Sequence, residues 1–213
     1  MISKRQYLKK SRLYLITNEN IEAAKKSLQA GSDIVQLRIK EKDDQFFLRR
    51  ALHLRKITKR FKKILIINDR IDIALLVNAD GIHLGQKDIP IKEARKLLGP
   101  KKIIGKSTHG VEEAKDAVNE GADYIGIGPA FSTKTKIHYK PLKINTIKKI
   151  IAHINIPYFI IGGINLRNIQ SLLQCDITKV AIFSSIIKNE NPRLQTKKFL
   201  EKLANENDIN RKS

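Results

Sequence analysis

The chain has 213 residues, of which 41% are hydrophobic and 30% are charged, and it contains one cysteine, Cys175. This length supports one substantial hydrophobic core and lies near the lower size limit of a single eightfold α/β barrel, which argues against a second domain. One cysteine excludes an intrachain disulfide, and no apolar run approaches the ~20 residues needed to cross a bilayer, so we expect a cytoplasmic protein.

The formal net charge of +21 raises the question of nucleic-acid binding, because Lys and Arg side chains neutralise phosphates. However, the basic residues are spread over nearly every predicted helix, and no aromatic series lies among them to stack on bases. We therefore expect no specific nucleic-acid partner. A drift in composition that adds lysine to solvated helix faces explains the charge equally well.

The predicted elements alternate between short β-branched runs and longer stretches with helical spacing of apolar residues. Residues 1–11 are basic but lack the apolar run of a secretory signal, so we expect a polar lead-in, and residues 206–213 are expected to fray. The predicted strands are Leu13–Ile16, Ile34–Leu37, Ile64–Ile67, Gly81–His83, Ile103–Gly105, Tyr124–Ile127, Tyr158–Ile161 and Lys179–Ile182. The predicted helices are Ile21–Ala30, Gln45–Phe61, Ile71–Val77, Ile91–Leu98, Val111–Glu120, Ile144–His153, Leu166–Leu173 and Arg193–Asn205.

Eight consecutive β-then-α units predict an α/β fold in which residues 1–213 form one domain, a (β/α)8 TIM barrel. An open doubly wound sheet is the alternative. No G-x-G-x-x-G motif follows an early strand, so nothing indicates dinucleotide binding.

Polar residues gather at the carboxyl ends of the predicted strands, where barrels of this kind perform chemistry. Asp69 and Asp88 follow the third and fourth strands, and two carboxylates suit a Mg²⁺ ion shared with substrate phosphate. The alternative is that both residues are N-caps of the helices that follow. Arg38 and Lys40 alternate with apolar neighbours and should face an anion at the barrel mouth, or else form a salt bridge at the rim with Asp69 or Glu41.

A second group of polar residues follows strands six to eight. The loop from Gly128 to Pro141 is rich in Ser, Thr and Lys and has the composition of a lid over phosphate, or of a merely solvated loop. Gly162-Gly163 and Ser184-Ser185 occupy the usual place of a phosphate held by backbone N–H groups, although a turn and a helix cap would use the same residues.

Two anion sites therefore emerge, one suited to a Mg²⁺-bound diphosphate and one suited to a monophosphate. A diphosphate bound to Mg²⁺ is a good leaving group. No Glu or Cys is expected at the barrel centre, which argues against proton abstraction and covalent catalysis.

The chain resembles the thiamine-phosphate synthase family over nearly its whole length. The resemblance rests on motifs in the same order: Gln36-Leu37-Arg38-x-Lys40, Asn68-Asp69, Asp80 to Gln86 with Asp88, Gly105-x-Ser107-Thr108-His109, Gly121 to Tyr124 with Gly126, Gly128 and Pro129, Thr133-x-Thr135-Lys136, and Ile161 to Ile164. It implies an enzyme that joins an aminopyrimidine diphosphate to a thiazole phosphate and releases diphosphate first, leaving a pyrimidine methyl cation that the thiazole nitrogen captures.

The resemblance also assigns roles to individual residues. It implies that Asp69 and Asp88 bind Mg²⁺ and that Arg38, Lys40, Ser107 and Lys136 are catalytic. The residues implied to surround the pyrimidine diphosphate are Gln36, Leu37, Arg38, Ile39, Lys40, Asn68, Ser107 and Lys136. Those implied to hold the thiazole phosphate are Thr133, Lys134, Thr135, Gly163, Phe183 and Ser184. His83 and His109 are secondary candidates.

The sequence departs from the family pattern at Ile39, Lys87 and Ser132, which bears on diphosphate binding and on the stiffness of the lid. Three alternative functions remain: a thiazole tautomerase of the same fold, a non-catalytic basic nucleic-acid-binding barrel, and a sugar-phosphate isomerase. The expected partners are small phosphorylated substrates, with no membrane partner, and a homo-oligomer is left open.

Overall fold

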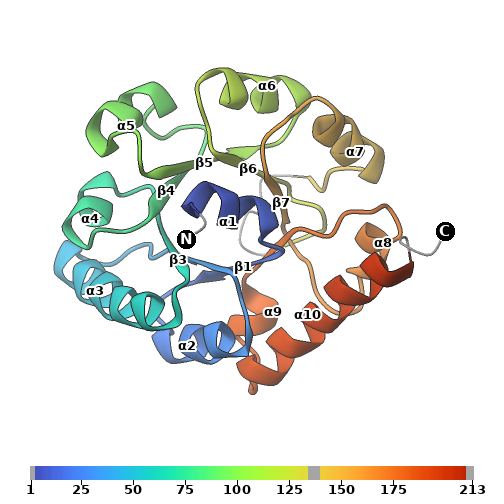
Figure 1. The fold of residues 1–213 in the computed structure, drawn as a ribbon, viewed down its shortest axis with the longest axis horizontal. Helices are drawn as coiled ribbons and strands as arrows, with labels where there is room; N and C mark the ends of the chain where they lie inside the picture. Colours follow the sequence, from blue (N-terminus) through green and yellow to red (C-terminus); the bar gives the residue numbers. More distant parts are fainter. Residues whose placement is uncertain (1–2, 134–139, 210–213) are drawn as a thin grey trace.

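A computed structural model describes residues 3–133 and 140–209. Its strands form a closed, all-parallel barrel in the order β1 to β8, with β8 pairing back onto β1 (Figure 1). The strands are β1 (Leu13–Thr17), β2 (Ile34–Leu37), β3 (Ile64–Asn68), β4 (Gly81–Leu84), β5 (Ile103–Thr108), β6 (Tyr124–Ile127), β7 (Tyr158–Ile161) and β8 (Val180–Ile182). The TIM-barrel prediction is thus confirmed and the open sheet is excluded.

Helices surround the barrel on its outer side, except the first, which lies across one end of the barrel (Figure 1). They are α1 (Lys4–Lys10), α2 (Ile21–Ala30), α3 (Asp44–Phe61), α4 (Ile71–Leu76), α5 (Ile91–Leu98), α6 (Val111–Asn119), α7 (Ile144–Ala152), α8 (Gln170–Leu173), α9 (Ser184–Ile187) and α10 (Pro192–Ile209). None of the described helices is both long and apolar enough to span a membrane.

Alternation along the strands divides the core into two layers. Side chains such as Tyr14, Ile34 and Phe159 fill the inside of the barrel, whereas Leu37 and Ile39 pack outward against the helices. Successive residues of one strand therefore have different environments. This division decides which strand-end residues reach a central pocket.

The segment expected to be a polar lead-in forms helix α1, which lies across the barrel opening in Figure 1. A capping box between Ser3 and Gln6 begins the helix, and Leu8, 1% exposed, packs with the inner-layer residues. Arg5 bonds Asp123 at 2.5 Å, and Lys4 bonds the buried Asp80 at 2.5 Å. Helix α1 therefore closes the end of the barrel where the strands begin.

Three further helices differ from the prediction by more than one residue. Helix α10 ends at Ile209 rather than Asn205, so residues 206–209, which were expected to fray, continue the helix, and residues 210–213 lie outside the described part of the chain. Helix α8 begins at Gln170 rather than Leu166, because Asn165 and Asn168 accept hydrogen bonds from local backbone N–H groups and hold a turn there. The short helix α9 was not predicted, and it directly follows Phe183.

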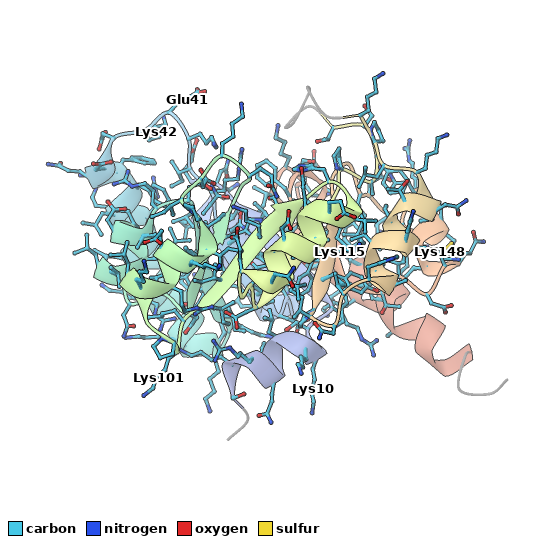
Figure 2. All side chains as sticks on the ribbon, turned by 90° about the horizontal axis from the view of Figure 1, so that it is seen from above. Lys10, Glu41, Lys42, Lys101, Lys115 and Lys148 are labelled. Carbon is cyan, nitrogen blue, oxygen red and sulfur yellow. The ribbon has the colours of Figure 1, made fainter. Side chains whose placement is uncertain are left out.

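The exposed lysines are distributed over several faces rather than gathered on one. Figure 2 shows Lys42 near the end where β2 finishes, Lys10 and Lys101 at the opposite end, and Lys115 and Lys148 on the side. Of these, Lys10, Lys115 and Lys148 lie on helices, whereas Lys42 and Lys101 lie in loops, so the positive charge is not confined to helix faces.

Candidate active site

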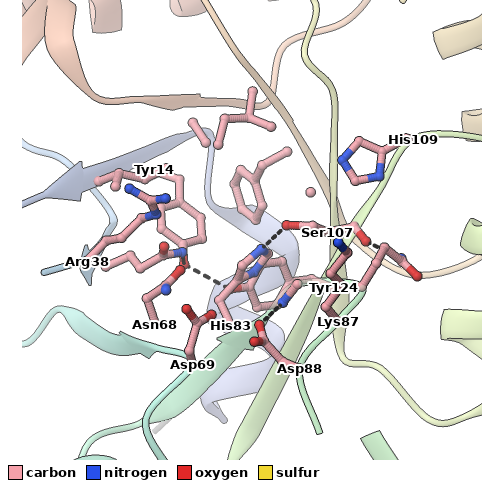
Figure 3. Close-up of a pocket in the computed structure, with 18 of the residues that line it drawn as sticks. Tyr14, Arg38, Asn68, Asp69, His83, Lys87, Asp88, Ser107, His109 and Tyr124 are labelled. Carbon is pink, nitrogen blue, oxygen red and sulfur yellow. Dashed lines mark hydrogen bonds between the residues drawn. The ribbon is translucent and has the colours of Figure 1, made fainter. Parts of the chain in front are cut away.

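A cavity of about 390 Å³ opens where the strands end, as predicted for a barrel of this class (Figure 3). Predicted site residues from four successive strand ends meet there. They are Gln36, Arg38, Lys40, Asn68, Asp69, Asp88 and Ser107, joined by the secondary candidates His83 and His109.

Asp69 and Asp88 are not helix caps. The N-cap of α4 is Arg70 and that of α5 is Pro90, and neither cap has a side-chain hydrogen bond. Asp69 has a left-handed backbone, with φ of 60°, and its N–H donates to the His83 carbonyl. Asp88 accepts a hydrogen bond from Gly85 N at 2.5 Å. Both side chains are thereby held beside the cavity rather than on a helix terminus (Figure 3).

The electrostatics of this pair suit a divalent cation. Burial, and then the neighbouring Asp88 carboxylate, raise the pKa of Asp69 to about 6, although Lys40 and Arg38 act in the opposite direction. A cation between the carboxylates would relieve this repulsion. In the described part of the chain no three His, Cys, Asp or Glu side chains form a metal cluster, so the pair would leave most positions to water and substrate oxygens, as Mg²⁺ prefers.

Arg38 and Lys40 both line the cavity, as their alternation predicted. The ammonium of Lys40 lies 3.7 Å from Asp69, which is a long contact for a half-exposed lysine. The rim salt bridge is therefore present but weak. Leu37 and Ile39, assigned to the same site through the resemblance, direct their side chains into the outer layer and do not line the cavity.

A hydrogen-bonded series of side chains crosses the floor of the cavity. Gln36 Nε2 donates to the Tyr14 hydroxyl at 2.8 Å, and that hydroxyl lies 2.8 Å from the hydroxyl of Tyr124. His83 Nδ1 lies 3.0 Å from Tyr124, and His83 Nε2 lies 2.9 Å from the hydroxyl of Ser107 (Figure 3). These residues come from five strands, so the series connects opposite walls of the barrel.

The ring of Tyr124 lies where the side chain of any residue other than glycine at position 105 would be. A Cβ at Gly105, on the neighbouring strand, would lie 2.1 Å from Tyr124 Cζ. Phe159 packs edge-on against both Tyr14 and Tyr124, with ring centroids 5.1 Å and 5.9 Å away. Burial raises the pKa of Tyr14 and of Tyr124 well above their usual range, so both phenols stay protonated.

A second cavity, of about 80 Å³, adjoins the first and contains predicted thiazole-phosphate residues. Thr133, Gly163, Phe183 and Ser184 line it. The predicted residues Lys134, Thr135 and Lys136 lie outside the described part of the chain.

The glycine turn after β7 anchors the start of the predicted lid. Ala130 N donates to Ile161 O at 2.8 Å, and Phe131 N donates to Gly162 O at 3.0 Å. Gly163 has φ of 64°, and a Cβ there would lie 2.4 Å from the Ser132 carbonyl. Close approach of the two loops therefore requires glycine.

Of the three departures from the family pattern, only Lys87 lines the larger cavity, where it adds a cation. Ile39 is buried in the outer layer, and Ser132 brings its backbone against Gly163.

Tyr14, Tyr124 and Phe159 were not predicted as site residues, yet all three line the larger cavity. The resemblance motifs included Tyr124, but each of these aromatic residues lies in an apolar strand and carries the signal of an ordinary core residue. His109 is occupied by a local contact: its Nδ1 and its backbone N lie 2.9 Å and 2.7 Å from Glu113 Oε2.

The family model and the most similar sequence relatives point to the same family. A family model described as thiamine monophosphate synthase matches residues 12–186. The thiamine-phosphate synthase of Clostridioides difficile (strain 630) is 41% identical over 210 residues, covering 95% of this chain and 100% of that protein. A solved structure of thiamine phosphate pyrophosphorylase from Pyrococcus furiosus superposes with a TM-score of 0.85 at 31% identity, covering 93% of this chain and 98% of that chain.

Several relatives are longer than this chain. The thiamine-phosphate synthase of Prochlorococcus marinus (strain AS9601) is 44% identical over 203 residues, which cover 94% of this chain but 58% of that protein. The chain thus spans less than two thirds of the length of such relatives.

Proposed function

The chain belongs to the thiamine monophosphate synthase family, and from this membership we propose that it is a thiamine-phosphate synthase. The proposed substrates are 4-amino-2-methyl-5-(diphosphooxymethyl)pyrimidine and thiazole phosphate, with or without a carboxylate. The proposed products are thiamine phosphate and diphosphate, and a carboxylated thiazole would also release carbon dioxide.

The observation that carries this proposal is the junction of two unlike cavities. The larger contains three cations (Arg38, Lys40 and Lys87) and two carboxylates, whereas the smaller is lined mainly by glycines, hydroxyls and apolar groups, with Arg38 as its cation. Both cavities share a wall formed by Ile16, Arg38, Ile161 and Ala181. A condensation needs two substrates whose reacting atoms meet, and a shared wall provides such a meeting place.

In the proposed reaction, the bond between the pyrimidine methylene carbon and the diphosphate oxygen breaks, and its electron pair leaves with diphosphate. Arg38 and Lys40 stabilise the charge that develops on this leaving group. Lys136 is proposed to add a further cation, a role that comes from the family resemblance alone.

Asp69 and Asp88 are proposed to hold Mg²⁺, which would neutralise diphosphate charge and make diphosphate a better leaving group. The raised pKa of Asp69 and the carboxylate pair beside the cavity support this assignment.

The lone pair of the thiazole nitrogen then forms the new carbon–nitrogen bond with the methylene cation. Thr133, Gly163, Phe183 and Ser184 are proposed to orient the thiazole phosphate, and Lys134 and Thr135 keep the same predicted role. Gln36 and Asn68 are proposed to hold the pyrimidine. No step requires a side chain to remove a proton.

The test is the release of inorganic diphosphate by the purified protein given both substrates, with and without Mg²⁺, and with the product identified by mass. We expect one thiamine phosphate for each diphosphate, and only with Mg²⁺. A folded protein that shows no turnover would instead favour the tautomerase or a decayed enzyme. A cytoplasmic location and the absence of a specific nucleic-acid partner stay predictions.

A further inference from the structure

The side-chain series that ends at Ser107 has a direction. Tyr14 is 2% exposed, and its hydroxyl accepts a hydrogen bond from the Gln36 amide N–H. A hydroxyl has one proton, and among the described residues the other partner of Tyr14 is Tyr124. Because an unsatisfied buried hydroxyl is costly, Tyr14 donates its proton to Tyr124.

The same reasoning continues along the series. Tyr124, 1% exposed, has accepted from Tyr14 and therefore donates to His83 Nδ1. A neutral histidine that accepts at Nδ1 has its proton on Nε2, so His83 donates to the hydroxyl oxygen of Ser107. The proton of Ser107 is then available to the cavity.

We propose that Gln36, Tyr14, Tyr124 and His83 form a one-way hydrogen-bond relay that holds His83 as the Nε2–H tautomer and makes Ser107 a hydrogen-bond donor toward the substrate. This proposal rests on the proposed function of the cavity. Gln36, Tyr14, Tyr124 and His83 act here as positioning residues through Ser107. The group that Ser107 faces must carry a lone pair, such as a ring nitrogen or an ester oxygen of the pyrimidine diphosphate.

If the hydrogen bonds ran in the opposite direction, Ser107 would donate to His83 instead of to the substrate. If the Gln36 position only accepted, Tyr14 would donate to it and Tyr124 would donate to Tyr14. His83 would then carry its proton on Nδ1 and accept from Ser107, which would turn the serine proton away from the substrate. The amide at position 36 therefore determines whether the Ser107 hydroxyl, on another strand, donates or accepts a hydrogen bond.

The experiment is nitrogen-15 NMR of the histidine side chains in the ligand-free protein above neutral pH. The His83 signals are assigned by their loss in His83→Gln. We expect Nε2–H in the parent protein and Nδ1–H in Gln36→Glu, because a carboxylate accepts and does not donate. An Nδ1–H tautomer in the parent protein would overturn the proposal, as would an unchanged tautomer in a folded Gln36→Glu variant.

Two more variants complete the test. Tyr14→Phe removes the hydroxyl that connects Gln36 to Tyr124, and it adds no charge. His83 should then show a mixture of tautomers, and this test remains available if Gln36→Glu does not fold. A single, unchanged tautomer in Tyr14→Phe would contradict the relay. Tyr7→Phe is the matched control, because the Tyr7 hydroxyl bonds Lys63 outside the relay. Its His83 spectrum should equal that of the parent protein.

Measurements of turnover distinguish a failure of this inference from a failure of the proposed function. Tyr14→Phe should lower kcat/KM for the pyrimidine diphosphate by about 10-fold, the effect of losing one oriented hydrogen bond. If the parent protein releases no diphosphate, the proposed function fails while the His83 spectrum still decides the direction of the relay. Normal turnover in Tyr14→Phe would show that Ser107 orientation does not matter to the reaction.

Discussion

The ammonium of Lys40 lies 3.7 Å from the carboxylate of Asp69, and Asp69 also faces the carboxylate of Asp88. One lysine at this distance does not neutralise two carboxylates. We therefore expect the pair to bind a further cation, and this binding can be tested separately from catalysis.

Asp69→Asn should abolish Mg²⁺-dependent diphosphate release, lowering turnover by roughly 100-fold or more, as expected when charge stabilisation is lost from a leaving group. Asparagine tolerates the left-handed backbone at this position, so the fold should be retained. The melting temperature of the metal-free variant should equal or exceed that of the parent protein, because a partly buried charge that repels Asp88 is removed. Asp72→Asn is the control, since Asp72 pairs with Arg70 at the surface; equal turnover in both variants would refute the metal site.

Arg38→Ala and Lys40→Ala should differ in which substrate they affect. Arg38 lines both cavities, so its loss should raise the KM for the pyrimidine diphosphate and for the thiazole phosphate. Lys40 lines only the larger cavity, so its loss should raise the first KM alone. Steady-state kinetics with each substrate varied in turn measures both, with Arg49→Ala, on the outer surface of α3, as the control. Identical profiles for the two variants would argue against two sites with a shared wall.

Gly163→Ala should destabilise the protein and weaken binding of thiazole phosphate. The left-handed backbone alone costs about 1 kcal/mol for alanine, and the contact with the Ser132 carbonyl adds about 1–3 kcal/mol of overpacking. Gly121→Ala isolates the first cost, because Gly121 has φ of 90° and no atom within 4 Å of an added Cβ. Urea unfolding of both variants gives the difference. If Gly163→Ala and Gly121→Ala lost equal stability, the loops at Ser132 and Gly163 would be able to move apart at no cost in free energy of unfolding.

Asp80→Asn should lower stability near neutral pH by about 3 kcal/mol, because it leaves the largely buried Arg55 without its charged partner. Burial alone would raise the pKa of Asp80, but the Leu65 N–H, Lys4 and Arg55 outweigh it and hold the pKa below the ordinary value of 3.8. The stabilisation is therefore present above pH 3.8 and is lost as the pH falls through the lower folded value. Urea unfolding measures the free energy of unfolding of both proteins near neutral pH and in acid. The difference between variant and parent should be smaller in acid. Lys4→Met, at a half-exposed partner, should cost far less.

The barrel was predictable because each strand is a short β-branched run and each helix follows it at regular spacing. The strand-end residues Arg38, Lys40, Asp69 and Asp88 were found for the same reason, since a parallel barrel brings all strand ends to one mouth. Leu37 and Ile39 entered the site only through the resemblance, and the pleat directs their side chains away from it.

The relay was not predictable from local pattern. Tyr14 and Tyr124 are 110 residues apart and touch only because β1 and β6 face each other across the barrel. Helix α1 was missed because its residues are mostly basic and only Leu8 is buried. Its stability comes from Asp80 and Asp123, and local spacing carries no information about such distant partners.

The ion pairs of α1 have a consequence for the order of events on the ribosome. Arg5 is made 118 residues before its partner Asp123. The first strand must likewise wait for β8 before its second edge is paired. The nascent chain therefore carries an unanchored basic helix until Asp80 and Asp123 have been made. It carries an unpaired edge of β1 for longer, until β8 emerges.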